Sequence, residues 1–320
     1  MDDEDYNVII FLEKSLKKPY FPAGEDFEDP SPLFYAKNGR ITKLKLFSRE
    51  FPKMVLSLKD LKRLDILDYF FNGEIPEYVI ELSMLENLYI IRLHSDNFPE
   101  VITLIPHLKK LYLYTIISYI PESIGNLKLL EEFAFSGESL ERLPESFGNL
   151  TSLVKLELAS NRLTILPESI GNLTSLQNFQ LSGNKLTSLP DSIGNLSSLR
   201  IFNITWNQMA TLPQSIGNLT SLSQLKLNNN ELTSLPESIG GLTSLRGLGL
   251  RNNKLSMIPE SIGTLKSLVS LDLSNNDLTS LPELILNLTS LKKIFLWENQ
   301  LNEGLEVIST LRDKGVEVMI

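Results

Sequence analysis

Apolar and polar residues alternate over very short stretches of this chain, and the same short stretch returns many times. In Leu156-Glu157-Leu158, alternation places both leucines on one face and the glutamate on the other, which is the pattern of a half-buried strand. A strand of three residues buries too little apolar surface to be stable alone. Stacked parallel copies cover one another's leucine rows, so the pattern predicts short parallel strands that stabilise their neighbours.

The spacing of the prolines gives the length of the repeating unit. Eight prolines lie 23 residues apart, at positions 121, 144, 167, 190, 213, 236, 259 and 282. Earlier prolines at 52, 76 and 99 continue the series less regularly. The matching apolar positions predict about twelve strands. Their centres are Leu44, Leu64, Leu88, Leu111, Phe133, Leu156, Phe179, Phe202, Leu225, Leu248, Leu271 and Ile294.

Each predicted strand is followed by a turn and a short helical segment. Pro167-Glu168-Ser169 suits the first turn of a helix, because the φ of proline is fixed and an acidic residue favours the positive helix end. The next glycine, Gly171, is expected to adopt a positive φ that ends the turn, as are its equivalents. One asparagine per unit stands where the chain leaves the strand. These asparagines are Asn161, Asn184, Asn207, Asn230, Asn253, Asn276 and Asn299.

The unit from Leu153 to Leu163 has the form L-x-x-L-x-L-x-x-N-x-L, and sequences such as LPESIGNLTSL follow the asparagine. This unit resembles the leucine-rich-repeat family, and its 23-residue form is similar to the intracellular Ras-group repeats. The resemblance covers roughly residues 41–302. It implies an α/β leucine-rich-repeat solenoid, a curved horseshoe with parallel strands on the concave face and short helical or 3-10 turns on the convex face. It also implies that the asparagines bond to backbone groups of neighbouring coils and form a ladder.

The two ends of the chain depart from the repeat and are predicted to cap it. Residues 1–36 are expected to form an acidic N-terminal cap with a helix and an extended lid, and residues 37–302 hold the repeats. Residues 303–320 are expected to form a C-terminal cap, with a helix over 304–314 and a last strand at 316–318. Both caps would cover the apolar face that a solenoid leaves open at its ends.

Composition and charge exclude several classes of function. The 320 residues are 42% hydrophobic and 22% charged, which is typical of a globular protein, and no apolar run is long enough to span a membrane. The chain has no cysteine and two histidines, so we expect no disulfide frame, metal cluster or cofactor. Of the net charge of −9, residues 1–30 carry −6, which leaves no general field for nucleic acid. These features predict a cytoplasmic protein without a nucleic-acid or membrane partner.

Nothing in the sequence has the arrangement of a catalytic centre. The glycines recur with the repeat rather than in a phosphate-binding cluster, and neither His94 nor His107 stands in a pattern with a serine nucleophile. We therefore expect no enzyme, but a protein–protein interaction scaffold or adaptor. A small GTPase or other signalling partner follows from family analogy alone. A receptor for a peptide or glycan, and more remotely an enzyme using the concave cleft, stay open, as does a monomer or a weak homodimer.

A partner is expected on the concave sheet, near the first four strands. These strands combine outward aromatic residues with mostly basic ones, and tyrosine and arginine are enriched at interface hot spots. Their units also vary in length and lose the asparagine, with Tyr69, Leu93 and Glu138 in its approximate places. Either these departures form a binding site for an acidic-aromatic segment, or they are the irregularity common beside a cap. The predicted site comprises Lys43, Lys45, Phe47, Arg63, Tyr89, Ile91, Arg92, Lys110, Tyr112 and Tyr114.

A second patch is predicted near the other end of the sheet. Two glycines at outward positions of one strand remove two side chains and are expected to leave a shallow dent, with aromatic residues around it. The alternative for Trp206 is that it packs against a neighbouring turn. The predicted patch comprises Trp206, Gly247, Gly249, Arg251, Phe295 and Trp297.

Overall fold

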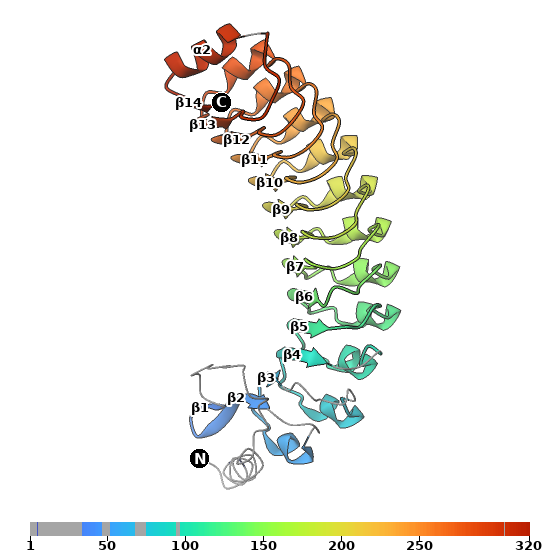
Figure 1. Ribbon diagram of the computed structural model, residues 1–320. Helices are drawn as coiled ribbons and strands as arrows, with labels where there is room; N and C mark the ends of the chain where they lie inside the picture. Colours follow the sequence, from blue (N-terminus) through green and yellow to red (C-terminus); the bar gives the residue numbers. More distant parts are fainter. Residues whose placement is uncertain (1–4, 6–33, 47–51, 68–74, 94–96, 304) are drawn as a thin grey trace, which may run out of the picture.

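The computed structural model describes residues 5, 34–46, 52–67, 75–93, 97–303 and 305–320, apart from the side chains of Arg92 and Leu93. Within these residues, fourteen strands form one sheet in chain order, from β1 to β14. Short 3-10 helices alternate with the strands, and the coil curves so that the strands line its inner, concave side and the 3-10 helices its outer side (Figure 1). The expected α/β leucine-rich-repeat solenoid is confirmed.

The strands are short, and most in the second half of the chain have three residues. They are β1 (Phe34–Lys37), β2 (Arg40–Leu46), β3 (Arg63–Ile66), β4 (Asn87–Leu93), β5 (Lys110–Thr115), β6 (Glu132–Ser136), β7 (Lys155–Glu157), β8 (Asn178–Gln180), β9 (Ile201–Asn203), β10 (Gln224–Lys226), β11 (Gly247–Gly249), β12 (Ser270–Asp272), β13 (Lys293–Phe295) and β14 (Glu317–Met319).

In the part of the chain that the structure describes, eleven 3-10 helices of five residues each form the outer side, and the α-helix α2 follows them. They are η1 (Lys53–Ser57), η2 (Glu77–Glu81), η3 (Glu100–Leu104), η4 (Glu122–Asn126), η5 (Glu145–Asn149), η6 (Glu168–Asn172), η7 (Asp191–Asn195), η8 (Gln214–Asn218), η9 (Glu237–Gly241), η10 (Glu260–Thr264), η11 (Glu283–Asn287) and α2 (Leu305–Asp313). A proline precedes each 3-10 helix in extended conformation or close to it, so proline sets the entry of the turn.

The twelve predicted strand centres all lie in strands, β2 to β13, which pair in parallel. Two further strands flank them. β14 pairs in parallel with β13 close to the predicted last strand. β1 pairs antiparallel with β2 through a turn at Asn38 and Gly39, both with positive φ, and the sequence interpretation had placed β1 inside an extended lid. The rest of the predicted N-terminal cap, except Asp5, lies outside the described residues.

The core is a set of apolar columns that run the length of the coil. Within one turn, Leu156 of β7, Leu158 just after it, and Ile170 and Leu173 on the outer side are all fully buried. The same positions in neighbouring turns are filled by leucine, isoleucine and phenylalanine, so each turn covers the apolar face of the next. A fully buried side chain of this size contributes about 1.5–3 kcal/mol relative to exposure.

The asparagines join successive turns through a repeated set of hydrogen bonds. The Oδ1 atom of Asn207 accepts a hydrogen bond from the backbone N–H of Leu186 in the preceding turn, at 2.9 Å. Its Nδ2 atom donates to the carbonyl of Leu181 in that turn and to the carbonyl of Ile204 in its own, at 3.0 and 3.1 Å. Bonds with the same sequence offsets recur from Asn161 to Asn299. The amide therefore satisfies backbone groups that no strand partner reaches.

The outer turns require glycine for a different reason from the one predicted. Among the described residues, only Gly39, Gly183 and Gly315 have positive φ, so the expectation for Gly171 and its equivalents was wrong. A Cβ atom on Gly171 would lie 2.5 Å from the carbonyl oxygen of Ser192 in the next turn. The position therefore requires glycine because neighbouring turns approach too closely for a side chain.

Positive φ occurs instead at the residue just before each ladder asparagine. These residues are Ser160, Gly183, Trp206, Asn229, Asn252, Asn275 and Glu298, and Glu138 has the same conformation one turn earlier. Glu138 therefore matches Ser160, and Ser139 takes the ladder position that the sequence interpretation gave to Glu138. The Ser139 hydroxyl donates to the carbonyl of Ile117 at 2.7 Å, which replaces part of the missing amide.

The C-terminal end of the coil is covered by α2. Ile308 and Leu311 on one side of α2 are buried in the common core, and Gly315 ends the segment with a φ of 80°. At the other end, the backbone N–H of Ile41 in β2 donates to the buried carboxylate of Asp5 at 2.7 Å. No helix in the described part of the chain is long and apolar enough to cross a membrane.

Candidate functional site on the concave sheet

Outward side chains of the sheet form two rows, because equivalent residues of neighbouring strands pair in register. The row nearest the strand starts includes Arg63, Asn87, Lys110 and Glu132. The second row begins with Lys45, Asp65, Tyr89, Tyr112 and Ala134. Residues in one row lie about 4.8 Å apart along the sheet, so side chains from adjacent strands are in direct contact.

Arg63 and Asp65 of β3 form the first part of the site. The Nε and Nη2 atoms of Arg63 donate to the two carboxylate oxygens of Asp65, at 2.8 and 3.0 Å. This two-point contact holds the guanidinium plane, and the hydrogen bond to Asp65 raises the pKa of Arg63 above its ordinary value. The guanidinium carbon lies 4.1 Å from the ring centre of Tyr89 on the next strand. The charge of Arg63 is thus shared between a carboxylate and an aromatic face.

Tyr89 of β4 stacks on Tyr112 of β5. Their ring centres are 4.4 Å apart and their planes differ by 10°. We call Arg63, Tyr89 and Tyr112 the tyrosine stack. Both rings are half-buried, so one part of each faces solvent while the other packs on a neighbour. Aromatic pairs of this kind contribute about 0.5–1.5 kcal/mol beyond the area they bury.

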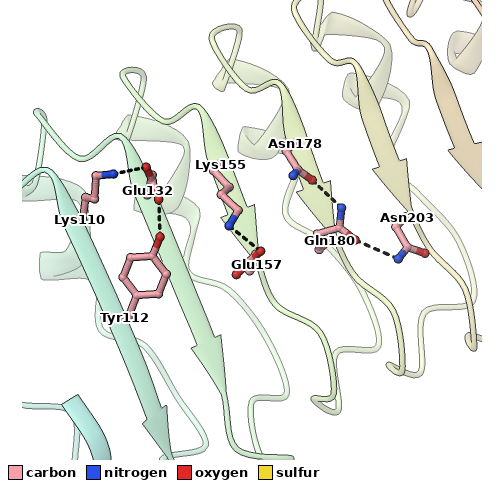
Figure 2. Close-up of polar contacts among 8 residues, drawn as sticks. All are labelled: Lys110, Tyr112, Glu132, Lys155, Glu157, Asn178, Gln180 and Asn203. Carbon is pink, nitrogen blue, oxygen red and sulfur yellow. Dashed lines mark hydrogen bonds and ion pairs between the residues drawn. The ribbon is translucent and has the colours of Figure 1, made fainter. Parts of the chain in front are cut away.

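Glu132 of β6 closes the site, as Figure 2 shows. The Lys110 ammonium and the Tyr112 hydroxyl both donate hydrogen bonds to its carboxylate. Burial alone raises the pKa of Glu132, but the hydrogen bonds from Lys110 and Tyr112 outweigh burial, so its pKa lies below the ordinary value. Burial, followed by the hydrogen bond to Glu132, raises the pKa of the Tyr112 phenol. The phenol therefore stays a neutral donor at physiological pH.

Polar side chains cover the middle of the concave sheet. Figure 2 shows Lys155 paired with Glu157 on the same strand, at 2.8 Å. In the next two turns, the Gln180 amide donates to Asn178, and the Asn203 amide donates to Gln180 at 2.9 Å. These groups satisfy one another within the sheet. The middle thus separates the tyrosine stack from the second patch.

The structure brings several residues of the first predicted site together and places a carboxylate beside each of two cations. Arg63, Tyr89, Lys110 and Tyr112 lie in one connected network, but Asp65 and Glu132 neutralise its two cations. The predicted basic patch is therefore largely compensated there. The sequence interpretation omitted Glu132 from the site, although its place one strand after Lys110 in the same row was a usable signal.

The other predicted residues surround this network. The Lys43 ammonium lies 5.5 Å from the Tyr35 ring centre, and Lys45 is half-buried in the same strand. Tyr114 is 42% exposed and pairs in register with Ile91. Phe47 and the side chain of Arg92 lie outside the described residues.

The second patch does contain a depression, with a volume of about 540 Å³. Gly247, Gly249 and Phe295 line it, as predicted, and so do Lys226 and Asp272. Trp206 does not line it. That residue stands at a positive-φ turn position and is 64% exposed, so it does not pack into a neighbouring turn.

Comparison with protein families identifies the repeat. A model described as "Leucine-rich repeat region" matches residues 94–188 and 178–250, and a "Leucine Rich Repeat" model matches residues 267–288. These matches together span more than half of the chain. The chain belongs to the leucine-rich-repeat family. A search of curated protein sequences finds no significant match to this leucine-rich-repeat chain.

Solved structures with the same fold come from proteins of several kinds. A leucine-rich-repeat protein of Leptospira interrogans is 25% identical, with 87% of this chain and 90% of that chain covered and a TM-score of 0.53. An internalin, inlF, of Listeria monocytogenes is 25% identical, with 87% and 86% covered and a TM-score of 0.61. The structure of PEPR1 with AtPEP1 gives 25% identity and a TM-score of 0.67, and the match covers 93% of this chain but only 49% of PEPR1.

Leucine-rich repeats are in general a protein–protein interaction fold without catalytic chemistry. A metal site would require a group of at least three histidine, aspartate or glutamate side chains. The described part of this leucine-rich-repeat chain contains no such group. Glu132, the carboxylate with a perturbed pKa on the concave sheet, accepts a hydrogen bond on each of its two oxygens. Its arrangement is that of a structural contact rather than of an acid or base facing a substrate.

Proposed function

We propose that this leucine-rich-repeat chain is a non-catalytic scaffold or adaptor that binds a protein partner on its concave sheet, through the tyrosine stack. The observation that carries the proposal is the stack itself. Arg63, Tyr89 and Tyr112 present two tyrosine rings and one guanidinium from three adjacent strands. Tyrosine and arginine are the residue types that dominate binding energy at interfaces.

The stack is held in place before any partner arrives. Asp65 fixes the guanidinium from one side, and Glu132 fixes the Tyr112 hydroxyl from the other. Ordering a side chain of this size during binding costs about 0.5–1.5 kcal/mol, and the network has already restricted these rotamers. A fixed aromatic surface on a rigid sheet is the form that a protein-binding site needs.

The neutralised charges of the site determine which kind of partner surface we propose. The sequence interpretation expected an acidic-aromatic partner segment. Because Asp65 and Glu132 neutralise Arg63 and Lys110, the stack does not favour a strongly acidic partner. It favours a partner surface that brings an apolar or aromatic side chain against the rings and a hydrogen-bonding group to their rims. Tyr114, at 42% exposure, extends the same surface towards the strand ends.

The class of partner, the localisation of the protein and its oligomeric state belong to the same proposal. A small GTPase or another signalling protein, and localisation in the cytoplasm, rest on the resemblance of the repeat to the intracellular Ras-group form. A monomer or a weak homodimer is the proposed state in solution. A peptide or glycan receptor is the second candidate. For a peptide, it is favoured by the structural likeness to the plant peptide hormone receptor RGFR1, which was solved in complex with RGF2.

The test compares partners captured by matched variants. The wild-type chain, a Tyr89→Ala/Tyr112→Ala/Tyr114→Ala variant and a Gln180→Ala/Asn203→Ala control would each be used for affinity capture from the native host, followed by mass spectrometry. The control changes the same concave sheet several strands away. We expect the control to keep the wild-type partners and the tyrosine variant to lose them. Identical partners for all three proteins would refute the tyrosine stack as the site. A glycan array on the wild type separates the glycan receptor from both other candidates.

A further inference from the structure

The depression near the end of the sheet has a floor of exposed backbone. Gly247 and Gly249 occupy the two outward positions of β11, between Lys226 of β10 and Asp272 of β12. A Cβ atom on Gly247 would lie 2.3 Å from the Gln224 amide oxygen, and one on Gly249 would lie 2.8 Å from the Asn228 amide oxygen. The side-chain amides of Gln224 and Asn228 therefore occupy the space directly above the two glycines, and both residues line the depression. The remaining volume of about 540 Å³ is enough for one large side chain.

One aromatic residue lines the depression, and a second packs against it. Phe295 of β13 lines it, and the Phe295 ring packs edge-on against Trp297 with 5.3 Å between ring centres. The guanidinium of Arg251 lies 5.7 Å from the Trp297 ring centre. An apolar side chain that enters from the concave side would therefore meet an aromatic wall on one side and glycine backbone below.

The charges around the depression are unbalanced. Lys226 and Arg246 line it, and Arg251 follows Gly249 by two residues in the chain without lining it. None of the three forms an ion pair with another described residue. Asp272 is the acidic residue in the lining, and one of its carboxylate oxygens already accepts two hydrogen bonds from Ser274. This excess of cations contrasts with the whole chain, whose net charge is −9. It also contrasts with the surroundings of the tyrosine stack, where Arg63 pairs with Asp65 and Lys110 pairs with Glu132.

We propose that this depression is a second recognition site, which takes an acidic peptide segment of a partner protein with one bulky apolar side chain. The apolar side chain would occupy the depression over β11, beside the Gln224 and Asn228 amides and against Phe295. Flanking carboxylates would pair with Lys226, Arg246 and Arg251, which form no ion pair with another residue that the structure describes. Charge complementarity favours acidic over neutral or basic segments, and the glycine floor admits a side chain that the rest of the sheet would exclude.

The proposal rests on the protein-binding role of the concave sheet but not on the tyrosine stack. β5 and β11 are six strands apart, so about 29 Å separates the two sites along the sheet. An extended segment of roughly nine residues spans that distance. The two sites are therefore separable by mutation, and one partner segment is long enough to contact both.

The first experiment identifies the peptide chemistry. A display library of random linear peptides would be selected against the full chain, and the enriched peptides would be synthesised for fluorescence-anisotropy titrations. We expect enrichment of sequences with one large apolar residue flanked by aspartate or glutamate. Selection of neutral or basic sequences, or of no sequence at all, would overturn the proposal.

The second experiment locates the bound peptides with four proteins: wild type, Gly247→Leu, Lys226→Glu and Tyr89→Ala/Tyr112→Ala. The leucine side chain fills the depression, and the atoms it displaces belong to the flexible end of Gln224. Lys226 is exposed, so its reversal tests the charges without risk to the core. We expect affinity to fall at least about tenfold in Gly247→Leu and about five- to tenfold in Lys226→Glu, and to change less than about twofold in the tyrosine variant.

The variants separate the two sites. Acidic peptides that bind Gly247→Leu and Lys226→Glu as tightly as wild type would refute the depression. If the same peptides lost affinity only in the tyrosine variant, the depression would be refuted as their binding site. The binding role of the concave sheet would be supported. Loss in Lys226→Glu, with unchanged binding by the tyrosine variant, supports the depression even if Gly247→Leu does not fold.

Discussion

The rings of Tyr89 and Tyr112 lie 4.4 Å apart and nearly parallel, on neighbouring strands whose backbones pair at the same residues. The spacing of parallel strands, about 4.8 Å, is close to the distance at which aromatic rings stack. Two tyrosines in equivalent positions of consecutive turns therefore stack because the solenoid places them there. The hydroxyl of Tyr112 then reaches Glu132 on the following strand, which links the aromatic pair to the charge pattern of the sheet.

The raised pKa of Tyr112 predicts a loss of stability at alkaline pH. The pKa of this phenol in the folded protein lies above the ordinary 10.0, because burial and Glu132 disfavour its anion. The contribution is therefore fully present below about pH 10 and is lost as the pH rises towards the folded-state pKa. In urea unfolding from about pH 8 to pH 11, the free energy of unfolding of wild type should fall more steeply above pH 10 than that of Tyr112→Phe. Parallel curves would contradict the assignment, and tyrosinate absorbance provides an independent titration of the same group.

Most of the fold is predictable from the sequence because each turn repeats the same physical problem. The alternation around Leu156 gives the strand, and the period of 23 residues gives its neighbours, so the twelve strand centres and the outward positions follow. β1 is harder to predict, because Phe34–Lys37 shares no pattern with the repeat and pairs in the opposite direction.

The candidate sites are predictable only in part. The outward position of Tyr89 and Tyr112 follows from alternation, but the neutralising role of Glu132 depends on cross-strand register and side-chain direction. Gly171 shows a second limit. A recurring glycine shows that no side chain fits a position, but not why. Both a positive φ and the close approach of another backbone segment require glycine, and at Gly171 the cause is the approach of Ser192.

The asparagine ladder predicts a sharp contrast between two adjacent residues. Asn253 bonds the Leu232 N–H and the carbonyls of Leu227 and Leu250, all buried. Its replacement by alanine leaves these groups without partners, so we expect Asn253→Ala to lower the free energy of unfolding by about 2–4 kcal/mol. Asn252 has a positive φ, and its exposed side-chain amide donates to Asn229 in the preceding turn and accepts from Asn275 in the next. Asn252→Gly keeps that φ and should cost less than about 1 kcal/mol. Equal losses in chemical denaturation would show that the ladder adds no special stability.

The close approach of outer turns predicts that glycine is irreplaceable at Gly171. A Cβ atom there meets the backbone oxygen and Cβ of Ser192 at 2.5 and 2.6 Å, and backbone cannot move aside without separating the turns. We expect Gly171→Ala to destabilise the protein by about 1–3 kcal/mol, as overpacking does. Gly247→Ala is the matched control, because the atom it meets is the end of the Gln224 side chain. Thermal unfolding of both variants tests the difference, and a smaller loss for Gly171→Ala than for Gly247→Ala would contradict this explanation.

Trp206 occupies a turn position that its side chain does not favour. Its φ is 58°, a region that costs most residues about 1–2 kcal/mol, and the next three turns place asparagine at the same position. Its ring is 64% exposed, so little buried area repays that cost. We therefore expect Trp206→Asn to raise the free energy of unfolding by about 0.5–1 kcal/mol. Asn229→Trp, the reverse change one turn later, should lower it by a similar amount. If Trp206→Asn were instead destabilising, the indole would have to make contacts that compensate for its backbone. A stabilised variant that bound captured partners less well would show that Trp206 is kept for binding at the expense of stability, as expected of an exposed aromatic residue beside a concave binding face.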